Sequence, residues 1–271
     1  MQPFIVREPT SAPVPLVVSI PHAGTHLPEA LRARLDSDAM RALPMTDWHL
    51  MELYDFLPAL GVTTIMSPWS RFYVDLNRAP VDRPLYPGRF ETGLIALQTF
   101  QGETVWRDPP SADEIMEHRA QVHAPYHARL LTLLSSVRQH CAGKVWLIDA
   151  HSVASAASKL HGELTDEVFL GDRDGTSCAE WFMVAVDEAF KRHQRRVSRN
   201  HPYKGGYITD NYGRVPGTMA LQIEMAQRVY MDEADPAGGP GHARFAPAKA
   251  ELNRVFEAIV KALAERGAAA A

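Results

Sequence analysis

Three short apolar segments, each closed by acidic or histidine residues, limit most strongly how this chain can fold. They are residues 14–20 (VPLVVSI), 144–149 (KVWLID) and 220–224 (ALQIE). Short, apolar, β-branched runs of this kind are typical of buried strands. Because strands buried on both faces need cover from both sides, such segments predict a sheet enclosed by helices.

Further predicted helices and strands lie between and around these three segments. We predict helices over residues 28–35, 46–57, 111–141, 177–193 and 246–266, and further strands over residues 62–66, 72–76 and 167–170. A capping box at Ser111–Glu114 opens the longest helix, which Pro125 is expected to kink. Residues 80–110 are rich in proline and glycine, so we expect a functional loop or a small hairpin there. The alternation predicts one α/β domain over residues 1–271, with a mixed, mostly parallel sheet flanked by helices.

Composition excludes several classes of function. The net charge of −4 argues against a nucleic-acid partner, and no apolar run is long enough for a membrane span. The two cysteines, Cys141 and Cys178, form no CxxC pair, and the N-terminus has no signal-peptide pattern. We therefore expect a cytoplasmic protein that acts on a small molecule; the sequence does not determine the oligomeric state.

Potential metal ligands follow the predicted strands. His22 comes directly after the first strand and His151 shortly after KVWLID, while Asp47 lies at the start of a predicted helix. Ligands in open α/β sheets collect at the carboxyl ends of strands. A catalytic zinc site needs three such protein ligands and an open position for water. The set His22, Asp47 and His151 satisfies this need, with Glu224 as the general base.

Each of these residues alone also has a simpler explanation. A histidine after a strand is more often structural, Asp47 could favour a helix N-terminus, and Glu224 could be an outward-facing strand end. The metal hypothesis is favoured because all of them fit one reaction. His49 is the second choice for the position of Asp47. Asp149 lies two residues before His151 on the same side of the strand, where it could orient that ligand.

The remaining histidines carry weaker signals. His123 and His127 have a four-residue spacing, but the glutamate of an HExxH motif is absent, so we expect a solvated helix face. Surface positions are also expected for His118, His140, His193 and His242.

Two further clusters suggest substrate binding. Arg71, Asn77 and Arg78 could grip carboxylates, although Arg71 could equally pair with Asp75 or Asp82. Residues 204–213 combine glycines with polar and aromatic side chains, which suits a loop closing over a ligand or a simple surface turn. The candidates in that loop are Tyr207, Thr209 and Asn211.

In their order along the chain, these motifs resemble the N-formylglutamate amidohydrolase family. The matching stretches lie between about residues 14 and 230, and they are Ser19–Gly24, Thr46–Trp48, Ser70–Arg71, Val74–Arg78, Leu147–Ser152, Gly171–Asp172, Lys204–Gly206 and Gln222–Glu224. The resemblance implies a fold like the zinc-dependent exopeptidases and hydrolysis of N-formyl-L-glutamate to formate and glutamate, in histidine degradation. The segment 75–78 also looks like the anchoring motif of aspartoacylases, which implies that Asn77 and Arg78 hold a substrate carboxylate.

The resemblance also sets the roles expected at the reacting centre. It implies a divalent metal, most simply Zn²⁺, that activates water, with Glu224 as base and Arg71 binding a carboxylate or the oxyanion. One departure concerns the third ligand, because the wider carboxypeptidase group has a glutamate three residues after its first histidine, where this chain has Thr25. Asp47 is our choice instead. The alternatives are a deacylase for acetyl or succinyl amino acids and a carboxylate-binding protein without catalysis.

Overall fold

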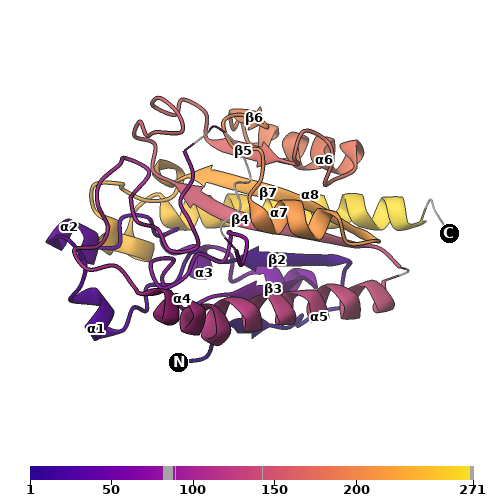
Figure 1. Ribbon diagram of the computed structural model, residues 1–271. Coiled ribbons are helices and arrows are strands. Elements are labelled where there is room, and N and C mark those ends of the chain that lie inside the picture. Colours follow the sequence, from indigo (N-terminus) through magenta and orange to yellow (C-terminus); the bar gives the residue numbers. More distant parts are fainter. Residues whose placement is uncertain (82–87, 89, 142, 269–271) are drawn as a thin grey trace.

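The computed structural model describes residues 1–81, 88, 90–141 and 143–268, and it is built on one seven-stranded sheet (Figure 1). The strand order is β1-β3-β2-β4-β7-β5-β6. The strands are β1 (Ile5–Arg7), β2 (Leu16–Ile20), β3 (Thr63–Met66), β4 (Val145–Val153), β5 (Val168–Gly171), β6 (Val197–Arg199) and β7 (Thr218–Ala226).

The sheet is mixed but mostly parallel, as predicted. Strands β3, β2, β4 and β7 run parallel to one another and form its centre. The edge strand β1 is antiparallel to β3, and β5 is antiparallel to β7, with β6 parallel to β5. The carboxyl ends of β2, β4 and β7 therefore meet at one edge, and the register places His151 beside Glu224.

Helices cover both faces of this sheet (Figure 1). α5 and α7 pack on one face, and α6 and α8 lie on the other. The helices are α1 (Glu29–Arg32), α2 (Asp38–Arg41), α3 (Leu50–Leu53), α4 (Ala112–His118), α5 (Ala124–His140), α6 (Glu180–Lys191), α7 (Tyr207–Gly213) and α8 (Phe245–Ala268). Short 3₁₀ turns occupy Leu57–Leu60, Gln227–Val229 and Pro236–Gly241, and a π turn occupies Arg119–His123.

Alternate residues of a strand pack into two separate hydrophobic cores, one on each face of the sheet. Leu16, Val18 and Ile20 of β2 join a core with α6 and α8, whereas Val17 joins the core under α5. Successive side chains of a strand point to opposite faces, so a strand covered on both sides must be apolar throughout. This burial explains why β2 is mostly apolar and why β4 begins with four apolar residues.

Several predicted elements were wrong in detail. Residues 72–76 form turns rather than a strand, with Tyr73 N donating to Ser70 O and Arg78 N to Asp75 O. The helix expected over residues 46–57 is reduced to α3, because His49 takes a left-handed backbone conformation (φ 60°) just before it. Residues 207–213 form helix α7 instead of a loop. Strands β1 and β6 were not predicted, since three residues carry too little pattern.

The long predicted helix is confirmed, with one change. Its capping box at Ser111 and Glu114 is formed. Where a kink was expected at Pro125, the helix widens into the π turn just before α5. Proline lacks the N–H that an α-helical bond would need, so the chain adds one residue to that turn.

The loop over residues 80–110 carries a small hairpin in its described part, where Gln98 pairs with Thr104. Residues 82–87 and 89 of this loop lie outside the described residues. None of the described helices combines the length and the apolar character needed to cross a bilayer.

Candidate metal centre and active site

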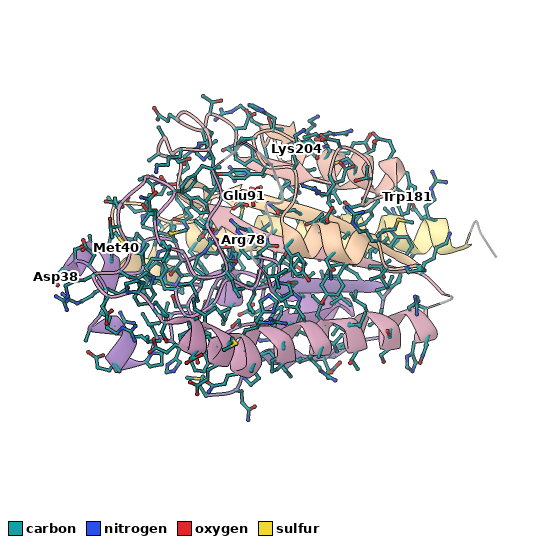
Figure 2. The ribbon with its side chains drawn as sticks, in the orientation of Figure 1. Asp38, Met40, Arg78, Glu91, Trp181 and Lys204 are labelled. Atoms are coloured by element: carbon teal, nitrogen blue, oxygen red, sulfur yellow. The ribbon has the colours of Figure 1, made fainter. Side chains whose placement is uncertain are left out.

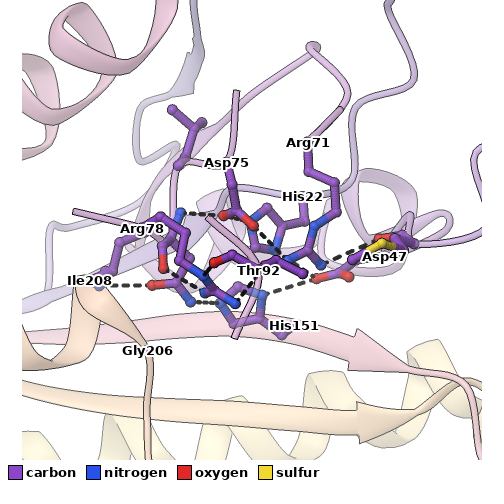
Figure 3. A network of polar contacts seen from close by, with 12 residues as sticks. His22, Asp47, Arg71, Asp75, Arg78, Thr92, His151, Gly206 and Ile208 are labelled. Atoms are coloured by element: carbon purple, nitrogen blue, oxygen red, sulfur yellow. Dashed lines mark hydrogen bonds and ion pairs between the residues drawn. The ribbon is translucent and has the colours of Figure 1, made fainter. Parts of the chain in front are cut away.

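His22, Asp47 and His151 come together at the carboxyl edge of the sheet. All three are buried, and one potential ligand atom from each lies within 4.8 Å of the others. Asp47 Oδ2 is 3.0 Å from His151 Nδ1 and 3.8 Å from His22 Nδ1 (Figure 3). Among the described residues, the buried His22 Nδ1 has no hydrogen-bond partner. Two ring nitrogens and a carboxylate oxygen thus surround one small volume.

The second nitrogen of each histidine faces a fully buried carboxylate. His22 Nε2 lies 2.8 Å from Asp75 Oδ1, and His151 Nε2 lies 2.9 Å from Asp149 Oδ2. The carboxylate accepts a hydrogen bond from Nε2–H and leaves Nδ1 with its lone pair facing the centre. Two imidazoles and one carboxylate, oriented in this way, fit the ligand set of a catalytic zinc ion.

Charges around the centre perturb its titration. Burial would raise the pKa of Asp75, but Arg71 and His22 hold it well below its usual value. Burial and then Arg71 lower the pKa of His22. Burial acts in the same direction on His151, yet Asp149 and Asp47 raise the pKa of that ring well above its usual range. Asp149 and Asp47 thus favour a positive charge at the position of the His151 ring.

Arg71 is tied to the same carboxylate that holds His22. Its Nη2 donates to Asp75 Oδ2 at 2.7 Å, and its guanidinium lies 5.3 Å from the centre of the Phe100 ring. The expected pairing of Arg71 with Asp75 is thus observed, and Asp82 lies outside the described residues. Arg71 also lines the cavity beside the centre, so the ion pair does not remove it from a ligand's reach.

Glu224 lies on β7 opposite His151. Gln222 Nε2 donates to Glu224 Oε2 at 3.0 Å, and Gln222 Oε1 accepts from Gly206 N at 2.8 Å. Burial, with added repulsion from Asp47, raises the pKa of Glu224 to about 8. This carboxyl group can therefore take up or release a proton near neutral pH.

The side chain of Asn77 is hydrogen-bonded to Asp149 and to the backbone, which leaves it little hydrogen-bonding capacity for a substrate. Its Nδ2 donates to Asp149 Oδ2 at 3.2 Å, and its Oδ1 accepts from Ile208 N at 2.8 Å (Figure 3). Gly206 makes this possible, because a Cβ at that position would lie 2.3 Å from Asn77 Nδ2. Asn77 thus lines the cavity with both ends of its side-chain amide hydrogen-bonded to the protein, and its role as a carboxylate anchor stays a prediction.

A cavity of about 450 Å³ opens onto the centre. Its lining includes Arg78, Glu91 and Lys204, which are labelled in Figure 2. Arg78 donates from Nε and Nη2 to Thr92 O and Oγ1 at 2.7 and 2.9 Å. Seven predicted site residues line the cavity, namely His22, Asp47, Arg71, Asn77, Arg78, His151 and Glu224.

Comparisons with known proteins identify the family of the chain. A family model described as N-formylglutamate amidohydrolase matches residues 14–231. The chain belongs to this family. It is 38% identical to an N-formylglutamate deformylase of Pseudomonas putida over 82% of this chain and 84% of that protein. It is 37% identical to the N-formylglutamate deformylase of Pseudomonas aeruginosa, over 93% and 92% of the two chains. As a family member, it is an amidohydrolase that acts on a linear amide.

Solved structures show the same fold. The crystal structure of an N-formylglutamate amidohydrolase from Ralstonia eutropha JMP134 superposes with a TM-score of 0.84 at 27% identity, over 98% of this chain and 99% of that one. A gene product of Agrobacterium tumefaciens gives a TM-score of 0.71 at 17% identity, over 96% of both chains, and shows the fold alone.

Some predicted site residues of this family member lie elsewhere. Tyr207, Thr209 and Asn211 belong to α7 and are not among the described residues that line the cavity. His49 lies outside the His–Asp–His group, since its Nε2 is 2.7 Å from Pro236 O. The geometry therefore favours Asp47 over His49.

The solvent-exposed positions expected for His118, His123 and His127 were also wrong. His118 and His123 are buried, and His127 is only partly exposed. His123 and His127 do share a face of the helix, with ring centroids 4.3 Å apart, but that face packs on the backbone of residues 76–78 and not on solvent.

Some residues in or behind the cavity were not identified from the sequence. Asp75 could have been found, because a ligating histidine usually needs a carboxylate behind it. Gln222 had only its position two residues before Glu224. Tyr203 and His161 come from separate loops and meet with Oη 2.6 Å from Nε2. Only the folded chain brings such residues together.

Proposed function

We propose that this amidohydrolase converts N-formyl-L-glutamate and water to formate and L-glutamate, using one Zn²⁺ ion bound by His22, Asp47 and His151. The observation that carries the proposal is the buried group of these three ligands at the floor of a cavity that also contains Glu224 and two arginines. The names of the Pseudomonas relatives support the formylated substrate.

The residues of the centre fit the proposed ion. Asp75 and Asp149 hold the Nε2 side of the two rings and so direct the Nδ1 lone pairs inward. When bound, such an ion acts as a Lewis acid that polarises the amide carbonyl and makes water easier to deprotonate. Its charge would also lower the pKa of Glu224 from about 8, which favours the carboxylate form.

Glu224 would move the proton. As a carboxylate it accepts a proton from the attacking water, and as a carboxylic acid it donates that proton to the departing amine of glutamate. Gln222 holds Glu224 Oε2, so we assign the proton to Oε1. The raised pKa suits both halves of this cycle, since one group must be base and acid in turn.

The arginines would bind the negative charge of the substrate and of the transition state. Arg71 lies at the floor beside the metal ligands, where a guanidinium can stabilise the developing oxyanion. Arg78 lines the wall and offers a planar donor group for a glutamate carboxylate. We assign no substrate contact to Tyr207, Thr209 or Asn211.

Formate release from N-formyl-L-glutamate tests the proposal, using chelator-stripped protein with and without added Zn²⁺. We expect release only after zinc is restored, and weaker hydrolysis of the acetyl and succinyl analogues. If the protein binds zinc but hydrolyses either analogue faster, the acyl group of that analogue, and not formyl, is the preferred one. Full activity of the chelator-stripped protein would refute the proposed requirement for a metal ion.

Family membership leaves the alternative of a carboxylate-binding protein without catalysis unsupported. A role in histidine degradation and a cytoplasmic location remain predictions of the sequence. Deletion of the gene, followed by growth on histidine as the nitrogen source, would test the pathway.

A further inference from the structure

Three histidines of the long helical segment bind the backbone of one stretch of chain. His118 lies on α4, His123 ends the π turn and His127 lies on α5. Each ring is hydrogen-bonded to a main-chain carbonyl within residues 73–78, at 2.9–3.0 Å. That stretch carries Asp75, Asn77 and Arg78, which are the residues behind and beside the metal centre.

Two of these bonds flank Asn77. His127 Nε2 lies 2.9 Å from Leu76 O, and His123 Nε2 lies 2.9 Å from Arg78 O. A carbonyl oxygen can only accept, so both rings must carry their proton on Nε2. The Leu76–Asn77 and Arg78–Ala79 peptide groups, which bracket Asn77 and Arg78, are thereby fixed from outside the cavity.

The π turn is what allows all three rings to reach the same stretch. His118 and His123 are five residues apart across the π turn, and His123 and His127 are four apart across a normal helical turn. Side chains five apart share a face only where the helix is widened in this way. A regular helix would rotate His118 away from the other two.

Burial favours the neutral state of the His123 and His127 rings, in which each can still donate from Nε2. Burial lowers the pKa of His123. Burial and then the neighbouring His123 lower the pKa of His127 to about 3. Tyr212 Oη lies 3.0 Å from His127 Nδ1, where it can donate to the free lone pair. Such neutral rings act as fixed donors throughout the neutral pH range.

We propose that His123 and His127 are positioning residues, which set the reaction geometry by fixing residues 76–78. Through Asn77 they hold Asp149, and Asp149 orients the ligand His151. Through the backbone of Arg78 they place its guanidinium on the cavity wall. The part that concerns Arg78 rests on the proposed function, since it assumes that Arg78 binds the substrate.

Paired substitutions test this role. His123→Leu and His127→Leu remove the donors, and His123→Gln and His127→Gln keep an N–H at about the place of Nε2. His140→Leu is the control, because His140 is exposed on the same helix and its ring is hydrogen-bonded only to Ser136 O in the described structure. Each protein is measured for kcat and KM with N-formyl-L-glutamate, and for amide hydrogen exchange over residues 72–80.

We expect each leucine variant to raise KM about tenfold, the effect of losing one buried hydrogen bond, and to speed exchange over residues 72–80. The glutamine variants and His140→Leu should stay close to the wild type in both measurements. Leucine variants with unchanged KM and exchange would overturn the proposal, and so would glutamine variants as impaired as the leucine ones. If the wild type releases no formate, the proposed function fails, while the exchange measurement still decides whether the histidines fix this segment.

Discussion

The two histidines of the candidate metal centre are both held by a buried carboxylate, but the two carboxylates come from different kinds of structure. The His22 half comprises His22, Asp75 and Arg71, and the His151 half comprises His151, Asp149 and Asn77. In the His151 half, ligand and carboxylate lie two residues apart on β4, which is hydrogen-bonded on both sides by β2 and β7. In the His22 half, the carboxylate comes from a turn segment more than fifty residues away.

The difference shows that one ligand is fixed by secondary structure and the other by tertiary structure. A strand paired on both sides places Asp149 under His151 wherever the strand forms. Asp75 instead depends on the turns of residues 70–78 and on the helix behind them. Asp75 also joins the metal ligand to Arg71, so a disturbance of the His22 half should reach both the metal and the substrate.

The largest effect is expected from a substitution of Glu224, the proposed general base. Glu224→Gln should lower kcat for formate release by about 10²- to 10⁴-fold, because the amide cannot accept the proton. The content of bound zinc, measured by elemental analysis, should not change. An active Glu224→Gln enzyme would show that another residue is the base.

Breaking the His22 half should have two consequences. Asp75→Asn removes the negative charge that holds both His22 and Arg71, so zinc affinity should fall about 10- to 100-fold and KM should rise as well. Competition with a coloured chelator measures the first effect, and steady-state kinetics the second. A change in zinc affinity without a change in KM would mean that Arg71 does not depend on Asp75.

Breaking the His151 half should have only one consequence, a loss of zinc affinity. Asp149→Asn should lower zinc affinity by a similar factor, about 10- to 100-fold, while KM at saturating zinc stays near that of the wild type. The same two assays compare the variants directly. If Asp149→Asn raised KM as much as Asp75→Asn, the division into two halves would be wrong.

A smaller effect should follow from crowding the His151 half. In Gly206→Ala the added methyl group would meet Asn77, which must move by some tenths of an ångström or more. Such overpacking should lower the unfolding free energy by about 1–3 kcal/mol and reduce zinc affinity slightly. Denaturant unfolding checks the first expectation. Gly162→Ala is a suitable control, because a Cβ there meets no atom within 4 Å.

The smallest effect is expected from a change outside both halves. Ser111→Ala removes the side chain that caps α4, which should lower the unfolding temperature by about 2 °C. Kinetic constants and zinc affinity should match the wild type. Any loss of activity would show that the position of the long helix matters more than its histidines.

The sequence predicted the parts of the site that a single strand defines. β2, β4 and β7 were visible as apolar runs, and the residues at their ends, His22, His151 and Glu224, were therefore found. The role of Asp75 and the buried state of His123 were missed, since both arise from the meeting of a turn segment with a widened helix. Residues 207–213 were predicted as part of a loop because the glycines that precede them are typical of turns. In the structure they form a short helix that is stabilised by packing.

The cavity combines a floor made of strand ends with walls made of loops. His151, Glu224 and His22 of the floor sit on β4, on β7 or shortly after β2, whereas Lys159, His161 and Tyr203 of the wall belong to connecting segments. Connecting segments tolerate substitution and insertion far better than central strands do. Evolution can therefore remodel which acyl amino acid enters such an enzyme while the hydrolytic machinery is inherited unchanged.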